Sequence, residues 1–219
     1  MKHTRGLFIT VEGGEGVGKS TNIHYLEENL ARQGVELVLT REPGGTPMAE
    51  NIRQLLLQVS DEPLTETAEL LLMFAARAQH IQQLIEPALA AGKWVLCDRF
   101  TDATYAYQSG GRGIDANKVR QLERLVQGEL RPDYTLLLDA PVDIGMARAG
   151  ERGELDRFEL EEIEFFKRVR NTYLKLAQES SGRYRVIDAS GSLDEVQVQL
   201  HKVCRELLAC WGVRHEESR

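Results

Sequence analysis

Cysteine is scarce in this chain of 219 residues, which has only three: Cys97, Cys204 and Cys210. Their number is odd and their spacing fits neither a disulfide framework nor a metal site, as expected for a protein in a reducing compartment. Long apolar runs are absent as well. The longest, Leu70 to Ala76, falls far short of the roughly 20 residues of a membrane-spanning helix, and Leu7 to Val11 is too short for a signal-peptide core. We therefore expect a cytoplasmic protein without a membrane segment.

Basic residues are outnumbered in the sequence. The chain has 27 Lys and Arg against 34 Asp and Glu, which gives a net charge of −7. This balance argues against a nucleic-acid partner, because binding to a phosphate backbone depends on Lys and Arg displacing counterions. A few clustered arginines can still form a positive pocket for a small phosphorylated ligand. With six prolines and 42% hydrophobic residues, the composition is that of a globular protein and not of a disordered one.

The order of apolar segments predicts one α/β domain over residues 1–219. Short apolar runs typical of buried strands alternate with longer segments of helical periodicity, as in βαβ units around a parallel sheet. Most runs end at or beside a polar or acidic residue, and ligands bind at that edge of an α/β sheet. The five predicted strands are Leu7–Glu12, Glu36–Thr40, Trp94–Asp98, Tyr134–Asp139 and Tyr184–Asp188.

Helix boundaries are marked by capping residues. Thr46 followed by Pro47 predicts a helix start, and Ser192 with Glu195 forms a capping box before the last helix. Pro87 interrupts a helical pattern, which it should break or kink. The glycines at the expected helix ends are Gly34, Gly92 and Gly128.

A glycine-rich loop follows the first predicted strand and precedes a helical segment. It reads Gly13-Gly14-Glu15-Gly16-Val17-Gly18-Lys19-Ser20 and matches the phosphate-loop pattern G-x-x-x-x-G-K-[ST]. Its glycines allow backbone N–H groups to converge on phosphate oxygens, Lys19 offers a charged donor to the β- and γ-phosphates, and the Ser20 hydroxyl suits Mg²⁺. A plain glycine turn is the alternative, which the strand-loop-helix context disfavours. The loop predicts nucleotide binding without choosing the reaction.

Two classes of phosphate-loop protein lack their own motifs here. A hydrolytic ATPase commonly ends a later strand with an acid pair, whereas the candidates here end as Asp98-Arg99 and Asp139-Ala140. A regulatory GTPase needs an N-K-x-D segment, but the pair Asn117-Lys118 is followed by Val119-Arg120. The water-activating acid and the guanine-reading motif are both missing from the sequence.

Arginines occur at two places that suit phosphoryl transfer. Arg99 follows the acidic end of a predicted strand, where Asp98 could hold the water shell of a metal or orient an arginine. The segment 145–159 contains Arg148, Arg152 and Arg157 and resembles a basic flap that closes over a nucleotide. The alternatives are a surface ion pair for the first and a solvated helix face for the second.

Five further segments resemble bacterial thymidylate kinases, in the same order and over nearly the whole chain. They are Arg41-Glu42-Pro43-Gly44-Gly45-Thr46-Pro47, Leu72-Met73-Phe74-Ala75-Ala76-Arg77, Asp98-Arg99-Phe100, Tyr107-Gln108-Ser109-Gly110-Gly111-Arg112-Gly113 and Arg152-Gly153-Glu154-Leu155-Asp156-Arg157. The resemblance implies a three-layer phosphate-loop fold, with a five-stranded parallel sheet flanked by helices and a short lid at about 145–159. It also implies transfer of the γ-phosphate of ATP to dTMP, giving dTDP and ADP for dTTP synthesis, with Mg²⁺ and in a homodimer.

The resemblance assigns roles to individual residues. On the acceptor side, Phe74 would stack on thymine, Tyr107 would crowd the ribose 2′ position, Arg53 and Arg99 would hold the phosphate, and Glu42 would lie near the metal. The remaining base contacts would come from Arg77, Thr104 and Gln108. Core packing is the alternative for Phe74, because it lies within the apolar run 70–76.

On the donor side, the resemblance assigns ATP to the phosphate loop with Thr21, and the metal to Ser20 and Asp98. The catalytic residues would be Lys19, Asp98, Arg99 and an arginine of the lid. Family members carry a catalytic arginine either in the phosphate loop or in the lid, and this loop has none. Arg152 is therefore the first choice, with Arg157 second, whereas Arg148 would stack on adenine, with residues 188–191 on the other side of the ring.

Two rival interpretations of the function remain. One is a kinase for another nucleoside or nucleoside monophosphate, and the other is a binding module that only switches shape.

Overall fold

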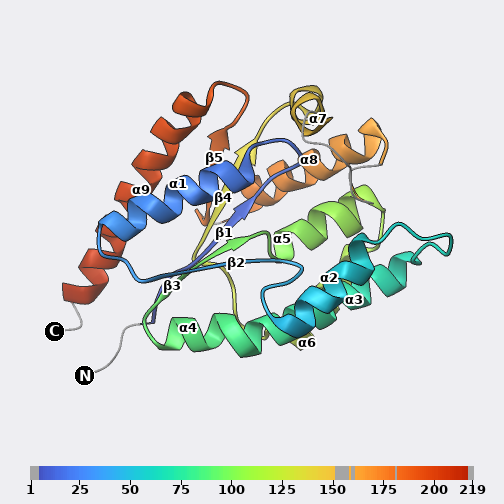
Figure 1. Ribbon diagram of the computed structural model, residues 1–219, viewed down its shortest axis with the longest axis horizontal. Helices are drawn as coiled ribbons and strands as arrows, with labels where there is room; N and C mark the ends of the chain where they lie inside the picture. The colour runs from blue at the N-terminus through green and yellow to red at the C-terminus, as the bar shows by residue number, and fades with distance from the viewer. Residues whose placement is uncertain (1–4, 151–157, 159–160, 181, 217–219) are drawn as a thin grey trace.

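The protein is built around a sheet of five parallel strands in the order β2-β3-β1-β4-β5 (Figure 1). The computed structural model describes residues 5–150, 158, 161–180 and 182–216. Because β1 lies at the centre and is followed by the phosphate loop, the loop emerges at the middle of the sheet's carboxyl edge. The strands are β1 (Phe8–Glu12), β2 (Leu37–Arg41), β3 (Trp94–Asp98), β4 (Tyr134–Asp139) and β5 (Tyr184–Asp188).

The sequence-based prediction of the sheet is confirmed. Three strands have the predicted bounds, β1 begins one residue later, and β2 is displaced by one residue toward the C-terminus. The pairing of β1 with β3 sets Val11 opposite Asp98, and the pairing of β1 with β4 sets Glu12 opposite Leu137. The ends of β1 and β3 therefore bring Glu12 and the Asp98-Arg99 pair to the same edge.

Helices cover both faces of the sheet and give three layers (Figure 1). On one face, the alternate residues Leu7, Ile9 and Val11 pack into a core with α1 and α9. Within the parts of the chain that the structure describes, no helix is both long and apolar enough to cross a membrane. The helices are α1 (Lys19–Arg32), α2 (Pro47–Leu57), α3 (Glu66–His80), η1 (Ile81–Ile85), α4 (Glu86–Ala90), α5 (Thr101–Thr104), η2 (Tyr105–Gly111), α6 (Ala116–Gln127), α7 (Val142–Gly150), α8 (Ile163–Glu179) and α9 (Leu193–Glu216).

The second face of the sheet is aromatic and partly polar. Phe8 packs edge to face against Phe100, with 4.9 Å between the ring centroids. Side chains alternate along a strand, so Thr10 and Glu12 point to the same face as Phe8. Thr10 is hydrogen-bonded there to Thr135 of β4, at 3.0 Å between the hydroxyl oxygens. The polar half of β1 thus lies under the edge where the loops gather.

The predicted helix signals are also confirmed. The Thr46 hydroxyl accepts from the Ala49 amide at 3.2 Å with Pro47 in the first turn of α2, and Ser192 and Glu195 form the reciprocal capping box before α9. Ahead of Pro87 the chain changes from α3 to the wider π-helical turn η1. A proline lacks the N–H and crowds the carbonyl four residues earlier, and the wider turn relieves that crowding.

Candidate active site

The phosphate loop is shaped by glycines at positive φ. Gly16 and Gly18 have φ angles of 66° and 82°, a region that other residues adopt only with strain. A Cβ atom on Gly16 would lie 1.8 Å from the carbonyl oxygen of Gly145 in α7. The loop leads into α1, whose first turn directs N–H groups and a partial positive charge toward the cavity. The expected strand-loop-helix arrangement is therefore present.

Lys19 lies inside the phosphate loop. Its ammonium donates to the carbonyl oxygens of Gly14 at 2.7 Å and Gly13 at 3.2 Å. Burial lowers the pKa of Lys19, as does the nearby Arg99 cation, while carboxylates including Glu15 and Asp98 oppose the shift. The loop therefore holds a positive charge away from bulk solvent, where its interaction with phosphate is strengthened.

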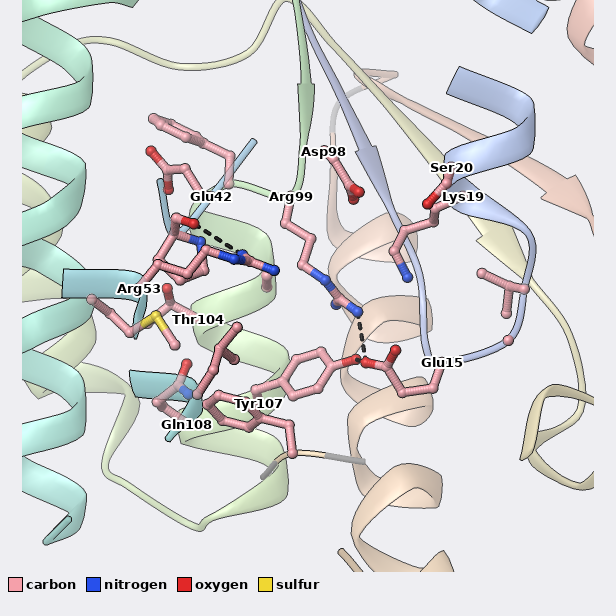
Figure 2. Close-up of a pocket in the computed structure, with 18 of the residues that line it drawn as sticks. Glu15, Lys19, Ser20, Glu42, Arg53, Asp98, Arg99, Thr104, Tyr107 and Gln108 are labelled. Carbon is pink, nitrogen blue, oxygen red and sulfur yellow. Dashed lines mark hydrogen bonds and ion pairs between the residues drawn. The ribbon is translucent and has the colours of Figure 1, made fainter. Parts of the chain in front are cut away.

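A cavity of about 510 Å³ opens beside the loop and collects most of the predicted site residues (Figure 2). Those of the donor side in its wall are Glu15, Gly16, Val17, Gly18, Lys19, Ser20, Thr21, Asp98 and Arg148. Those of the acceptor side are Glu42, Arg53, Arg77, Arg99, Thr104, Tyr107 and Gln108. Gly13 and Gly14 do not line this cavity, and Arg152 lies outside the described residues, as does its alternative Arg157.

Phe74, which the resemblance predicts to stack on thymine, is absent from the cavity wall of the described structure. It is 2% exposed and packs in a core cluster with Leu70, Ile114 and Val119. The preceding residue, Met73, lines the cavity. Neighbouring residues on a helix point about 100° apart, so Met73 and Phe74 face different neighbours. The centroid of the Phe74 ring lies 4.8 Å from the central carbon of the Arg77 guanidinium, so the stacking role stays a prediction, with core packing as its alternative.

Arg77 is buried and strongly constrained. Its Nε donates to Glu42 Oε2 at 2.7 Å, and one terminal nitrogen donates to the Thr104 hydroxyl at 3.0 Å. The other terminal nitrogen is buried and has no hydrogen-bond partner among the described residues. A buried donor without a partner costs about 1–3 kcal/mol, so a ligand acceptor in this cavity would be favoured.

Glu42, which the resemblance places near a metal, belongs to a buried polar network. One carboxylate oxygen accepts from Arg77, and the other lies 2.9 Å from Nδ1 of His80. Both oxygens are therefore engaged in a buried network on the acceptor side. Asp98, at the end of β3, has a buried Oδ1 without a partner in the described part of the chain.

The backbone is strained at Arg99, and the turn at this residue directs its guanidinium toward the phosphate loop. Arg99 is a non-glycine residue at a φ of 66°. Its guanidinium donates to Glu15 at 2.7 Å and to the Gly13 carbonyl at 3.1 Å, and its central carbon lies 4.7 Å from the centroid of the Tyr107 ring (Figure 2). Non-glycine residues in this region cost about 1–3 kcal/mol and persist where the surroundings hold them, often at functional sites.

Tyr107 and Gln108 lie on the π-helical segment η2. The Tyr107 hydroxyl donates to Glu15 at 2.6 Å, and the Gln108 amide donates to Glu69 at 2.8 Å. Burial raises the pKa of Tyr107 well above its usual value, so its hydroxyl stays protonated. Both side chains are thus held in fixed orientations in the cavity wall.

Arg148 connects α7 to the loop that follows β5. Its guanidinium donates to the carbonyl oxygens of Ala189 at 2.7 Å, Ser190 at 3.0 Å and Gly191 at 3.0 Å. The two segments predicted to enclose adenine are therefore adjacent, and they contact each other directly.

Comparison with known proteins identifies the family. The family model described as thymidylate kinase matches residues 11–200. The thymidylate kinase of Ectopseudomonas mendocina is 61% identical over 208 residues, which are 94% of this chain and 99% of that protein. That of Pseudomonas syringae pv. tomato is 60% identical over 203 residues, 93% of this chain and 97% of that protein. The chain belongs to the thymidylate kinase family.

A solved structure agrees with this membership. The crystal structure of thymidylate kinase from Ehrlichia chaffeensis superposes with a TM-score of 0.74 at 34% identity, covering 91% of this chain and 98% of that one. The chain is thus an α/β phosphate-loop kinase with a five-stranded parallel sheet.

Glu12, the last residue of β1, is a buried residue of the kinase that the sequence pattern indicates only as the end of a strand. One carboxylate oxygen accepts from the Phe100 amide and the other from the Tyr173 hydroxyl, both at 2.7 Å. Burial raises the pKa of Glu12 to about 8, and the nearby Asp102 adds to the shift, while the bonds from Tyr173 and Phe100 oppose it. The sequence signal for the role of Glu12 is an acidic residue at the end of an apolar strand.

This shift predicts a pH-dependent stability. The folded kinase retains a proton on Glu12 that the unfolded chain loses above pH 4.5, so stability should fall as the pH rises from about 4.5 to about 8. Glu12→Gln should remove a slope of about 1.4 kcal/mol per pH unit from the free energy of unfolding in this window. Urea unfolding at pH 5.5, 6.5 and 7.5 measures it, with the exposed Glu62→Gln as control. Parallel curves for wild type and Glu12→Gln would contradict the assignment.

Proposed function

We propose that the cavity holds ATP on its phosphate-loop side and dTMP on its α3 and η2 side, so that the γ-phosphate passes between them. The chain phosphorylates dTMP to dTDP with ATP as the donor, an activity that serves dTTP synthesis. One observation supports this assignment of the donor and acceptor sides. The phosphate loop and the buried Arg77 line the same cavity, and one terminal nitrogen of Arg77 has no partner among the described residues.

The donor side rests on backbone and cationic contacts. The amides of residues 13–20 and the start of α1 surround the ATP phosphates, and Lys19 neutralises charge on the β- and γ-phosphates. Thr21 continues this wall at the start of α1. Arg148 contributes to the adenine side, supported by its position at the cavity.

Two arginines bind the acceptor phosphate. Arg53 reaches the cavity from α2 and donates to the Pro43 carbonyl at 2.9 Å, and Arg99 reaches it from the turn after β3. Guanidinium groups bind phosphate through paired donors, which also orient the phosphate for in-line transfer. Arg99 contacts Glu15 and the Gly13 carbonyl, so it joins the acceptor phosphate to the donor loop.

The base and the sugar lie against α3 and η2. Arg77 donates to the thymine edge, Thr104 and Gln108 line the same region, and the Phe74 ring beside Arg77 stacks on the base. Tyr107 packs against the sugar on the side of the 2′ position and favours deoxyribose, because its orientation is fixed by Glu15 and the Arg99 stack.

Ser20 and Asp98 suit the magnesium ion that accompanies ATP. Both line the cavity, and Asp98 has a buried carboxylate oxygen that lacks a partner among the described residues. Hydroxyl and carboxylate oxygens are the hard ligands that Mg²⁺ prefers, usually together with waters and substrate phosphates. A bound Mg²⁺ would neutralise phosphate charge at this position.

The remaining catalytic charge is assigned to the proposed lid at residues 145–159, which begins within α7. The phosphate loop contains Glu15 and no arginine, so the charge that stabilises the transferring phosphoryl group must come from elsewhere. Arg152 is proposed for this role on sequence grounds.

The kinase is proposed to act in the cytoplasm as a homodimer. Exposed apolar side chains gather on the neighbouring helices α2, α3 and α6, namely Met48, Leu55, Leu71 and Leu125. Packing these side chains against a second copy would remove apolar surface from water.

Substrate choice tests the proposal directly. Purified protein with ATP and Mg²⁺ should produce ADP faster with dTMP than with dCMP, AMP or thymidine. Lys19→Ala should lower kcat/KM for dTMP by about 100-fold or more, through lost phosphate stabilisation, while the distant Lys93→Ala should not. Faster turnover with another acceptor would refute the acceptor assignment, and ATP binding without dTMP-dependent ADP production would indicate a binding module.

Arg152→Ala should separate turnover from binding. A charge delivered only as the phosphoryl group transfers lowers kcat when removed, and leaves the affinity for dTMP nearly unchanged. We expect kcat to fall by about 100-fold or more. Steady-state kinetics with varied dTMP would measure this, with Arg157→Ala as the matched variant. If Arg157→Ala has the larger effect, the catalytic charge belongs to that residue.

The oligomeric state should depend on the apolar surface of α2, α3 and α6. Wild-type protein should elute at twice the chain mass of 24.7 kDa, and Leu125→Glu should shift it toward the monomer because Leu125 is 79% exposed in the single chain. Val198→Glu on α9 is a matched control, since Val198 is 58% exposed on the opposite layer. Size-exclusion chromatography with light scattering gives the mass. A monomeric wild type, or dissociation by the control alone, would rule out this interface.

A further inference from the structure

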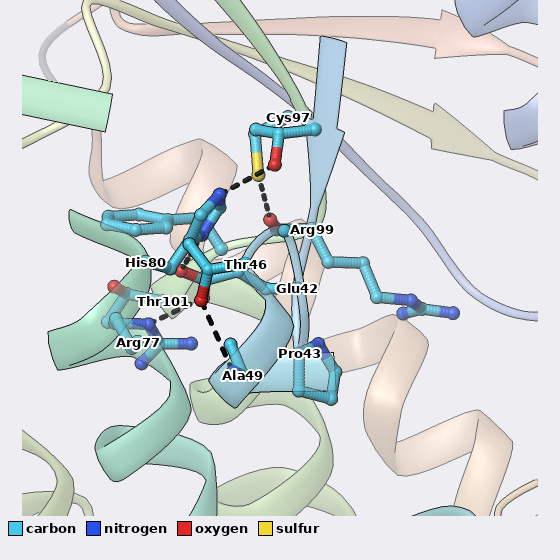
Figure 3. Close-up of polar contacts among 12 residues, drawn as sticks. Glu42, Pro43, Thr46, Ala49, Arg77, His80, Cys97, Arg99 and Thr101 are labelled. Carbon is cyan, nitrogen blue, oxygen red and sulfur yellow. Dashed lines mark hydrogen bonds and ion pairs between the residues drawn. The ribbon is translucent and has the colours of Figure 1, made fainter. Parts of the chain in front are cut away.

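A buried chain of polar contacts runs behind the acceptor side of the cavity. His80, at the end of α3, is fully buried, and its Nδ1 lies 2.9 Å from Glu42 Oε1 (Figure 3). The other oxygen of Glu42 accepts from Nε of Arg77 at 2.7 Å. On the far side of the ring, Nε2 of His80 lies 2.6 Å from the hydroxyl oxygen of Thr40 in β2. The order of contacts is therefore Thr40, His80, Glu42 and Arg77.

This chain fixes the orientation of the Arg77 guanidinium. Glu42 and Thr104 each engage one of its nitrogens, and the rings of Phe74 and Phe100 lie 4.8 Å and 5.1 Å from its central carbon. Only the remaining terminal nitrogen lacks a partner in the part of the chain that the structure describes. Two hydrogen bonds and two aromatic rings thus fix the guanidinium of Arg77. One of its terminal nitrogens remains as a donor without a partner among the described residues.

His80 fixes the orientation of the Glu42 carboxylate, and that carboxylate in turn positions Arg77. A carboxylate can only accept hydrogen bonds, so Nδ1–H of His80 donates to Oε1. Without that donor, Oε1 would compete for a second nitrogen of Arg77, because arginine and carboxylate readily form two parallel bonds. Such a change would draw the guanidinium away from Thr104 or from the cavity.

His80 also supports the loop that carries Glu42. A Cβ atom on Gly45 would lie 2.4 Å from Nε2 of His80 and 2.5 Å from the Thr40 hydroxyl oxygen. The loop therefore packs directly on the His80–Thr40 contact. Pro43 in the same loop lines the cavity. His80 is itself absent from that wall, so its influence on a ligand must pass through Glu42 and the loop.

We propose that His80 is a positioning residue for base selection: by fixing Glu42 it aims the available donor of Arg77, and this sets the preference for a thymine over a cytosine base. Thymine presents a carbonyl acceptor at the position where cytosine presents an amino donor, so a correctly oriented guanidinium can donate to thymine but not to cytosine. The inference rests on the proposed assignment of Arg77 to the base edge.

A pair of amide variants separates the two sides of the His80 ring. In His80→Asn the amide lies near the position of Nδ1 and can still donate to Glu42, whereas in His80→Gln it lies near Nε2 and faces Thr40. His80→Gln should raise KM for dTMP and lower the dTMP-to-dCMP ratio of kcat/KM, each by about tenfold, which is the effect of one weakened hydrogen bond to a charged group. His80→Asn should stay within about threefold of wild type, and KM for ATP should not change in either variant.

Arg77→Met provides the reference for these measurements. It should raise KM for dTMP and reduce the discrimination against dCMP, and His80→Gln should add little to it, since both variants remove the same contact. If Arg77→Met changes neither quantity, the assignment of Arg77 in the proposed function is wrong. If Arg77→Met has its effect and His80→Gln behaves as wild type, only the role of His80 is overturned.

A purely structural role for His80 predicts a different outcome. His80→Asn and His80→Gln would then lower the melting temperature and change kcat and KM for both substrates in parallel, which would overturn the proposal. Thr40→Val keeps the His80 ring and removes only the hydroxyl contact, so it tests the chain of contacts if the His80 variants do not fold. We expect it to raise KM for dTMP by about threefold with KM for ATP unchanged, and an unchanged KM for dTMP would count against the proposal.

Discussion

The buried carboxyl group of Glu12 holds together the two loops on which phosphoryl transfer depends. It ends the central strand, and the phosphate loop begins at the next residue. It accepts the Phe100 amide, which belongs to the turn that carries Arg99, and the hydroxyl of Tyr173 from α8. Burying a carboxyl group is costly unless its oxygens are hydrogen-bonded, so these three segments are stabilised in one arrangement. The strained backbone of Arg99 is tolerated at this point.

In this acidic protein, carboxylates orient the arginines and the amide that face the cavity. Glu15 holds Arg99, Glu42 holds Arg77, and Glu69 accepts from the amide of Gln108. In each case the acid orients a donor that faces the cavity, while the negative charge stays bonded to its partner. Donors fixed before a ligand arrives lose little on binding, which is the advantage of preorganisation. A net charge of −7 is therefore compatible with a pocket for two nucleotides.

Local patterns predicted the framework because they act over short distances. The strands, the caps at Thr46 and Ser192 and the phosphate loop follow from periodicity and from a few residues with strong backbone preferences. Periodicity did not show which of the apolar neighbours Met73 and Phe74 lines the cavity. The packing of Phe74 against α6 is a tertiary contact that no local pattern contains.

The partners of buried polar groups could not be predicted, because they are distant in the sequence. Glu42 pairs with Arg77 and His80 across 35 and 38 residues, and Glu12 meets Tyr173 across 161. Only the folded sheet edge brings such residues together. The resemblance placed Glu42 on the acceptor side, but it did not reveal that both carboxylate oxygens are already bonded.

The close approach of Gly16 and Gly145 has a mechanical consequence. A Cβ on Gly16 would collide with the Gly145 carbonyl at 1.8 Å, and a Cβ on Gly145 would lie 2.4 Å from the Glu15 carbonyl. Two backbones therefore touch with no side chain between them, so a larger residue at either position would force α7 and the phosphate loop apart. The position of α7 is therefore tied to the conformation of the phosphate loop.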